Sequence, residues 1–333
     1  MIYFDFYGFT VKLSSSSEDL LRLIKLNFSY FHVKELKEVH LEIEAFLKNG
    51  AEFLPKELVA KKQSVNSITY DLGDLRYNDY YGEALSILDY RNSSAKIFSS
   101  NINRLHEITY LLMMSRQGKW CDKKGIHKIH SMAVANEKKN LLVMLPMKGG
   151  KSTLFTKFLA ESKFQLISDD SPCVNSKGEI LNFPIRFGIE KKPMYEELLS
   201  SINKESIFTL QRNLYGEKIL VDMMFFHNRI AKPKKETVLV QGFRQNGGGF
   251  KVKKVAKVQM LKYLLINMTV GVGLPMVIEY FIENNIRDHL GNINIFLKRL
   301  YSTTNLLFKS DCYFAYMGND IDKNFNEIKK LMK

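Results

Sequence analysis

The stretch that decides the fold is NLLVMLPMKGGKSTLFTKFL, residues Asn140 to Leu159. Residues 141–145 form a continuous apolar run, which is typical of a strand buried on both faces of a sheet. Residues 152–160 place leucines and phenylalanines at helical spacing. Gly149 and Gly150 separate the two segments. The stretch therefore predicts a buried strand, a glycine loop and a helix, in that order.

The loop is similar to a phosphate-binding loop, although its spacing differs from the usual G-x-x-x-x-G-K-[ST] pattern. That pattern needs a glycine where this chain has Leu145, and Pro146 can redirect the chain there instead. Phosphate binding needs backbone N–H groups at a helix start, a lysine for the outer phosphates and a hydroxyl for Mg²⁺. The loop supplies all three, which predicts a nucleotide site. We expect the nucleotide to contact Lys148, Gly149, Gly150, Lys151, Ser152 and Thr153.

Two neighbouring carboxylates, Asp169 and Asp170, end the next predicted strand at residues 164–170. We expect this strand to run beside the strand at 141–145, which would bring the carboxylates to the glycine loop. A carboxylate in that place can hold Mg²⁺ or accept a hydroxyl proton. The alternative is a pair of aspartates that caps a turn before Pro172.

Composition describes a globular chain with room for two domains. The chain has 333 residues, of which 45% are hydrophobic and 25% charged. Its three scattered cysteines provide no disulfide framework, as expected in a reducing compartment. The net charge of +14 favours an anionic partner: a nucleotide, an acidic peptide, a phosphorylated metabolite, nucleic acid or a membrane face. A solvated lysine-rich surface is the plainer interpretation.

Pattern and turn residues predict the other elements. A helix at 102–117, ended by Gly118 and followed by a polar connection, separates an N-terminal α+β domain (1–118) from a second domain (126–333). The first domain is expected to recognise substrate or to be an accessory. Further predictions are a hairpin turning at Gly8, a helix from Glu18, strands within 38–47, 84–90, 95–100 and 236–243, a hairpin turning at Lys177-Gly178, and helices near 256–267, 276–286 and 321–332.

The most membrane-like stretch is Tyr263 to Ile278. It is too short to span a bilayer and is interrupted by Gly271, Gly273 and Pro275. We interpret it as a buried helix end and loop, with an interfacial segment as the alternative. The N-terminus lacks the features of a signal peptide, so the expectation is a cytoplasmic protein with no membrane span.

Taken together, residues 126–190 resemble the catalytic core of HPr kinase/phosphorylase-related proteins, which share a fold with phosphoenolpyruvate carboxykinases. The matching parts are His130 on the strand before the loop strand, the glycine loop, the aspartate pair, and Arg186 with Gly188 in an R-x-G turn. The following hundred residues match only loosely, and the first 115 do not match the N-terminal domain of the bifunctional enzyme. The resemblance implies an α/β fold with a mixed-sheet P-loop kinase core.

The resemblance also implies roles for the site residues, with ATP and Mg²⁺ as cofactors. Lys151 would bind the β- and γ-phosphates, while Ser152 and Asp170 would hold the metal. Asp169 would be the catalytic base with His130 beside it, and Arg186 would stabilise phosphoryl charge or the substrate. His130 as a half-buried strand histidine and Arg186 as a structural ion pair are alternatives. We expect nearby His127 on the surface, and Arg244 in a hairpin turn, with a phosphate contact as its alternative.

Two departures from the family narrow the expectation. Pro184 replaces a metal-binding glutamate, and the segment that supports phosphorylase activity is unrecognisable. The predicted activity is therefore transfer of the ATP γ-phosphate to a hydroxyl, foremost a serine or threonine of a protein or peptide other than HPr. The alternatives are a sugar or metabolite kinase, a carboxykinase-type lyase, and a non-catalytic nucleotide-binding or scaffold protein. The acceptor, the choice between ATP and GTP, and formation of a homo-oligomer stay open.

Overall fold

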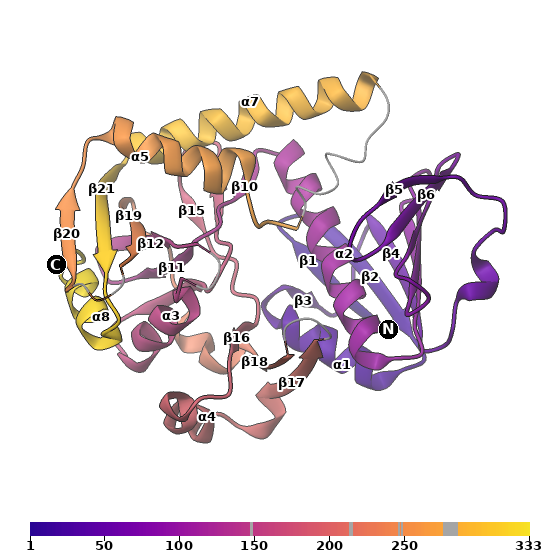
Figure 1. The fold of residues 1–333 in the computed structure, drawn as a ribbon, viewed down its shortest axis with the longest axis horizontal. Coiled ribbons are helices and arrows are strands. Elements are labelled where there is room, and N and C mark those ends of the chain that lie inside the picture. Colours follow the sequence, from indigo (N-terminus) through magenta and orange to yellow (C-terminus); the bar gives the residue numbers. More distant parts are fainter. Residues whose placement is uncertain (147–148, 213–215, 246, 248, 276–285) are drawn as a thin grey trace. The chain divides into compact units, whose positions relative to one another are not determined.

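The computed structural model is a mixed α/β protein with several sheets (Figure 1). It describes residues 1–333 except 147–148, 213–215, 246, 248 and 276–285. The chain divides into two compact units. The first consists of Met1–Gln117 and Phe208–Lys218, and the second of Gly118–Ile207 and Ile219–Lys333.

A nine-stranded sheet forms the frame of the first unit. Its order is β3-β1-β2-β4-β9-β8-β7-β6-β5. The hairpin between the first two strands turns at Tyr7 and Gly8, both with positive φ, which is the two-residue turn that suits the twist of paired strands. The predicted turn at Gly8 is thus confirmed. The strands are β1 (Ile2–Phe6), β2 (Phe9–Ser15), β3 (His32–Val33), β4 (Leu41–Phe46), β5 (Ala60–Gln63), β6 (Ile68–Leu72), β7 (Leu75–Asp79), β8 (Leu85–Asp89) and β9 (Ser94–Phe98).

Helix α1 (Glu18–Asn27) begins where its serine cap predicts. The Ser17 hydroxyl accepts a hydrogen bond from the Leu20 N–H, satisfying one of the free donors of the first turn. The helix buries Leu20 and Ile24. Just beyond its end, Phe28 packs edge-on against Phe6, with ring centroids 5.2 Å apart. The aromatic cluster of β1 thus fixes how α1 lies on the sheet.

Helix α2 (Ile102–Lys123) corrects the prediction that Gly118 ends it. The helix continues for five residues beyond this glycine. The last turn is stabilised by tertiary contacts, since Cys121 and Asp122 are both fully buried and Asp122 receives two hydrogen bonds from Arg299. These contacts outweigh the cost of about 1 kcal/mol that a glycine imposes inside a helix.

The second unit is built on a six-stranded mixed sheet of order β13-β11-β12-β19-β21-β20. Alternate residues of β12 enter two separate cores. Leu141 and Val143 pack with α3, whereas Leu142 and Met144 pack with the helices on the opposite face. The prediction of a strand buried on both faces is confirmed. The strands are β11 (Met132–Ala135), β12 (Lys139–Met144), β13 (Gln165–Ser168), β19 (Glu236–Arg244), β20 (Lys251–Lys254) and β21 (Ser310–Met317).

Helices cover both faces of this sheet (Figure 1). One face carries α3 (Lys151–Ala160) and α8 (Ile321–Lys330), joined by an edge-on contact between Phe158 and Phe325. The other carries α5 (Lys257–Leu264), the π-helical turn η6 (Leu265–Val270) and α7 (Ile286–Phe308). Helix α7 was not predicted, and the helix expected near 276–286 lies almost wholly outside the described residues.

Smaller elements complete the two units. Strands β14 and β15 form the hairpin predicted at Lys177-Gly178, and β10 pairs with β14. The described helices include none that is long and apolar enough to cross a membrane. The remaining elements are β10 (Ile126–Lys128), β14 (Cys173–Asn175), β15 (Ile180–Leu181), β16 (Phe187–Ile189), α4 (Glu196–Ser201), β17 (Ile207–Arg212) and β18 (Gly216–Val221), with short 3₁₀ turns at Ser29–Phe31, Ala51–Phe53, Pro193–Tyr195, Lys204–Ser206 and Met223–Arg229.

Candidate functional site

The loop between β12 and α3 requires its two glycines for different reasons. Gly150 precedes the first helical residue and has φ +95°, in the left-handed region that side chains disfavour. At Gly149 a Cβ would lie 2.8 Å from the carbonyl oxygen of Pro146, which accepts a hydrogen bond from the Gly149 N–H. The glycines thus allow a tight turn that presents the N-terminus of α3.

The side chain of Lys151, the first residue of α3, is largely buried. Its Nζ lies 2.5 Å from Nε2 of His130 and 3.4 Å from Oδ1 of Asp170. It also donates to the carbonyl oxygen of Leu145 at 3.2 Å. The residue that replaces the usual first glycine therefore contributes its backbone oxygen to the lysine site.

The two aspartates lie in different environments. Asp169 is 6% exposed, and its Oδ2 accepts a hydrogen bond from the Ser152 hydroxyl at 3.3 Å. Asp170 is a half-exposed carboxylate next to Lys151, with a side chain 51% exposed. The backbone N–H of Ser131 donates to the Asp170 carbonyl, which anchors the turn that carries both acids.

The strand order corrects the expectation that β13 lies next to β12. Strand β11 lies between them and pairs antiparallel with each. Because β11 is antiparallel to both, β12 and β13 run in the same direction and their carboxyl ends lie at one edge of the sheet. The aspartates reach the glycine loop across β11 for this reason. The sequence could not show it, because β13 pairs with β11 across some thirty residues of chain, and no local pattern fixes which strand it joins.

His130 lies between β10 and β11 rather than on a strand, which corrects its predicted placement. Its backbone N–H donates to the carbonyl of Asn267, and its ring lies so near Gly273 that a Cβ there would be 3.3 Å from the imidazole. Burial is the main cause that lowers the pKa of His130, and Lys151 adds to it, while Asp170 opposes it. A neutral imidazole can accept a hydrogen bond from the Lys151 Nζ at Nε2.

Thr153 on the first turn of α3 has a partner that sequence reasoning missed. The hydroxyl of Tyr195, a buried residue preceding α4, donates to Thr153 Oγ1 at 2.9 Å. No local pattern marks this tyrosine, because it lies far along the chain from the loop. Because Thr153 Oγ1 accepts this hydrogen bond, its own hydroxyl proton points away from Tyr195. The contact also holds the Thr153 side chain in one orientation.

The other predicted site residues are distributed as follows. Arg186 is half-buried and directly precedes β16, which packs behind α3 through the rings of Phe155 and Phe187. Arg244 is exposed at the carboxyl end of β19, which runs parallel to β12 and so ends at the same edge of the sheet. Lys148 lies outside the described residues.

His127 is buried, which corrects the expectation that it lies on the surface. Its Nδ1 lies 2.7 Å from Oδ1 of Asp122, whose two carboxylate oxygens also accept hydrogen bonds from Arg299. Arg299 lowers the pKa of Asp122 against the opposing effect of burial, and His127 assists. The three residues join the end of α2 to β10 and α7. Arg299 also donates hydrogen bonds to the carbonyl oxygens of Met268 and Thr269.

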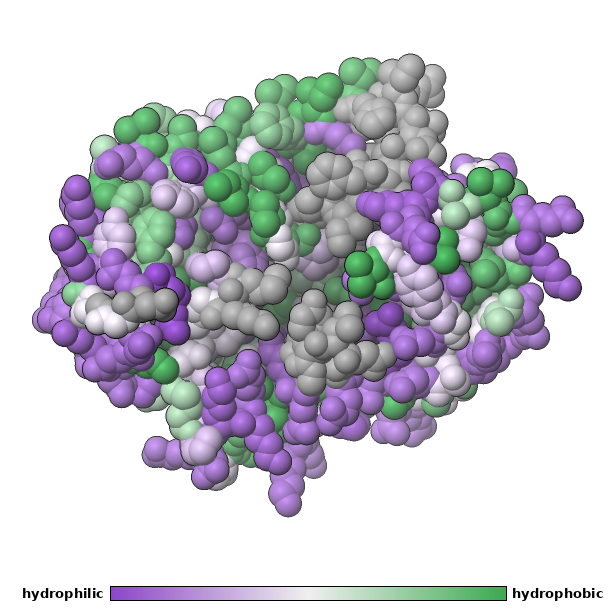
Figure 2. Space-filling model, viewed as in Figure 1, coloured by the Kyte–Doolittle hydropathy of each residue, from purple (hydrophilic) through white to green (hydrophobic). Residues whose placement is uncertain are grey.

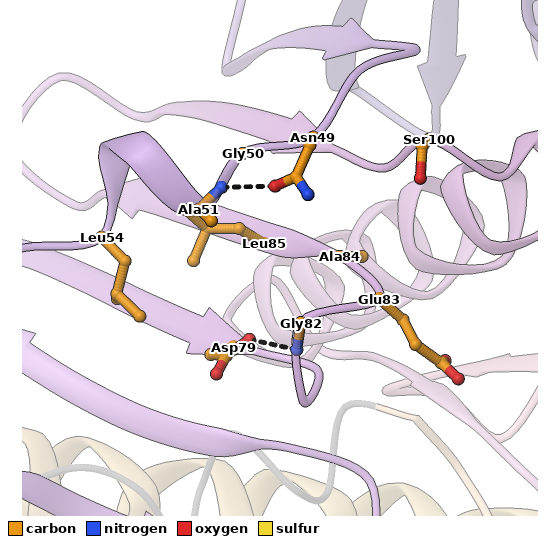
Figure 3. Close-up of a pocket in the computed structure, with 10 residues that line it drawn as sticks. All are labelled: Asn49, Gly50, Ala51, Leu54, Asp79, Gly82, Glu83, Ala84, Leu85 and Ser100. Carbon is orange, nitrogen blue, oxygen red and sulfur yellow. Dashed lines mark hydrogen bonds between the residues drawn. The ribbon is translucent and has the colours of Figure 1, made fainter.

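A small cavity in the first unit has a different character (Figure 3). Its volume is about 100 Å³. Asn49 and Asp79 on its wall accept hydrogen bonds from the backbone of neighbouring turns, at Ala51 and Gly82. The residues that line it include no lysine, arginine or histidine. The cavity therefore offers turn-forming polar groups and little positive charge for a phosphorylated ligand.

The glycine loop has the chemistry to hold a phosphorylated ligand with a metal ion. Backbone N–H groups and Lys151 can take up phosphate charge at the N-terminus of α3. The Ser152 hydroxyl and Asp169 carboxylate are oxygen ligands of the kind that Mg²⁺ takes, with phosphate and water oxygens completing the shell. No protein-family model matches the chain, and no curated protein sequence is significantly similar to it.

Proposed function

We propose that the chain is an ATP-dependent, Mg²⁺-requiring kinase with a P-loop core of the HPr kinase/phosphoenolpyruvate carboxykinase type. The observation that carries the proposal is the convergence of Lys151, His130 and two aspartates on the N-terminus of one helix. Phosphoryl transfer mainly requires positioning, neutralised charge and a carboxylate directed at the nucleophile. The site contains a candidate group for each requirement.

The contacts favour a particular division of roles between the aspartates. Asp169 is buried against the Ser152 hydroxyl, so these two oxygens are the candidate metal ligands. Asp170 is half exposed, so an incoming hydroxyl can reach it, and it is the candidate base. This reverses the roles that the family resemblance implies. Mg²⁺, when bound, would neutralise charge on the phosphates.

When a nucleotide binds, the Lys151 Nζ would leave its internal partners and contact the phosphates. His130 would stay in place and accept the hydrogen bond from Lys151 whenever the site is empty. Thr153, oriented by Tyr195, can donate its hydroxyl proton to a phosphate oxygen. The acceptor that we propose is a serine or threonine of a protein or peptide, and the net charge of +14 suits an acidic one.

The test measures nucleotide binding and transfer separately. Titration calorimetry with ATP and Mg²⁺ should show binding, and Lys151→Met should weaken it by about 10- to 100-fold because charge-assisted hydrogen bonds are lost. Labelled ATP with acidic Ser/Thr peptide libraries should give labelled product. Asp170→Asn should abolish the label while ATP still binds, whereas Asp169→Asn should raise the Mg²⁺ concentration required.

Asp322→Asn is the matched control, because Asp322 is exposed and pairs with Lys157 on the surface. This variant should retain both binding and transfer. If Asp169→Asn loses transfer at saturating Mg²⁺ and Asp170→Asn does not, the roles are those implied by the family. ATP binding without labelling of any peptide or small hydroxylated acceptor would favour a non-catalytic nucleotide-binding protein. Absence of ATP binding would contradict the proposal altogether.

A further inference from the structure

Helix α7 exposes an apolar stripe on its outer face. Leu290, Ile293, Leu297 and Tyr301 follow one another at intervals of three or four residues, so they share one side of the helix. Their side chains, with those of Phe296 and Phe308, are 47–66% exposed. In Figure 2 apolar residues gather along the upper edge, where Figure 1 places α7. An apolar face of this length on a surface helix indicates an interaction site.

The opposite face of α7 already forms the core. Ile295, Leu306 and Leu307 are buried there, and Arg299 donates hydrogen bonds to Asp122 and to the carbonyls of η6. The exposed stripe is therefore separate from the face by which α7 packs against its own unit. We expect substitutions in the stripe to leave the core contacts of α7 in place.

The neighbouring segment extends the apolar surface. Helix α5 and η6 pack along α7, as the hydrogen bond between the hydroxyls of Thr269 and Thr303 shows. Ile266, Val270 and Val272 of this segment are also exposed. The sequence predicted a buried helix end and loop at 263–278. Within the described part this is confirmed for Leu264 and Met268, which are buried, and wrong for the three exposed residues.

The charge along this surface is mostly positive, because α5, η6 and α7 together contain a single acid, Asp288, near the start of α7. Residues 257–275 and 290–309 contain no aspartate or glutamate, and their lysines are Lys257, Lys262, Lys298 and Lys309. The Lys257 Nζ lies over the ring of Phe308, 5.4 Å from its centroid, so a positive charge lies beside the last apolar residue of α7. The next acid along the chain, Asp311, is paired with Lys254.

We propose that the α5–η6–α7 face binds the surface of a membrane rich in anionic lipids. Apolar and aromatic side chains enter the region between headgroups and acyl chains, while lysines contact the anionic headgroups. A second copy of this chain fits less well, because two such faces would bring lysines against lysines in a protein with a net charge of +14. Binding would place the second unit at a membrane surface independently of what its site does.

The experiment is flotation of the full chain with vesicles of phosphatidylcholine alone or with 30% phosphatidylglycerol. The chain should float with the anionic vesicles and much less with the neutral ones. Ile293→Glu/Leu297→Glu should weaken binding at least tenfold because it places charge on the membrane-facing side. Lys257→Gln and Lys262→Gln should each weaken it about fivefold. The control is Val59→Glu/Val65→Glu, which places the same two charges on exposed apolar residues of the first unit and should bind as the unmodified chain does.

Three results would overturn the proposal. One is failure of the unmodified chain to float with anionic vesicles. Another is equal flotation of the Ile293/Leu297 variant when circular dichroism shows both proteins folded. The last is a dimer, measured by light scattering, that the stripe substitutions dissociate while vesicle binding persists, which would assign the face to a second copy.

Discussion

The Nζ of Lys151 lies 2.5 Å from Nε2 of His130, and burial lowers the pKa of that histidine. The folded protein therefore binds fewer protons than the unfolded chain below the ordinary histidine pKa of 6.5. Stability contributed at this position should fall as the pH drops below that value, since the protonated ring loses its acceptor and repels Lys151, with Asp170 opposing the effect. Denaturant unfolding of the chain and of His130→Gln between pH 5 and 7.5 measures it. A pH dependence identical in both proteins would contradict it.

Replacing Gly149 with alanine should destabilise the loop and weaken ATP binding. The new Cβ would meet the Pro146 carbonyl oxygen at 2.8 Å, and that backbone atom can move only if the turn opens. We expect a loss of about 1–3 kcal/mol in the free energy of unfolding. The control is Gly73→Ala, at a positive φ of +59° with open space around the new Cβ. It should cost stability through backbone strain alone and leave ATP affinity unchanged. If both variants bind ATP with equal affinity, Gly149 does not contribute to the nucleotide site.

Tyr195→Phe removes a single hydroxyl, the one that donates to Thr153. The expected loss of stability is about 1 kcal/mol, the usual net worth of a hydrogen bond. If Thr153 binds phosphate, ATP affinity should fall further in this variant than stability alone explains. Thr153→Val combined with Tyr195→Phe then gives the coupling between them from calorimetric affinities. Additive effects on affinity would show that the tyrosine only supports the fold.

Asp122→Asn should be among the more damaging single substitutions in the second unit. It removes the charge that faces the buried Arg299, and breaking one partner of a buried pair costs about 3–5 kcal/mol. Urea unfolding at pH 7 measures the loss, and adding Arg299→Met should recover part of it. For comparison, Asp322→Asn at the exposed pair with Lys157 should change stability by less than about 1 kcal/mol. If both variants lose a similar free energy of unfolding, the buried pair contributes no more to stability than the exposed one.

Lys128 is fully buried, with its Nζ 4.2 Å from the centroid of the Phe183 ring, and burial lowers its pKa to about 8. The unfolded chain keeps the proton up to its ordinary pKa of 10.5, so the unfolded state binds more protons between the two values. Stability linked to this residue should therefore rise as the pH increases through that window. Lys128→Met should be more stable than the unmodified chain at pH 7, and the difference should shrink by pH 9.5. A constant difference across that range would show that Lys128 keeps its ordinary pKa.

The sequence was most informative where local rules decide structure. The positive-φ turn at Gly8 and the Ser17 cap of α1 are local features, and the structure confirms both. The apolar run at 141–145 predicted a strand buried on both faces, and the order of strand, glycine loop and helix is also as expected. The assignment of this loop to a nucleotide remains a prediction.

Local rules failed where distant residues supply the free energy. Gly118 should end a helix, yet contacts of Asp122 with Arg299 extend it to Lys123. His127 is likewise buried rather than exposed, because it pairs with Asp122, whose carboxylate is held in turn by the distant Arg299.

By itself, the sequence determined which segments form strands and helices around the loop, since propensity, capping and apolar period act over a few residues. Only the tertiary structure decided that β11 separates β12 from β13, that Lys151 lies against His130, and that Tyr195 contacts Thr153. Such pairings depend on the order of strands in the sheet and on which side chains are desolvated together. Neither quantity is a property of any short stretch of the chain.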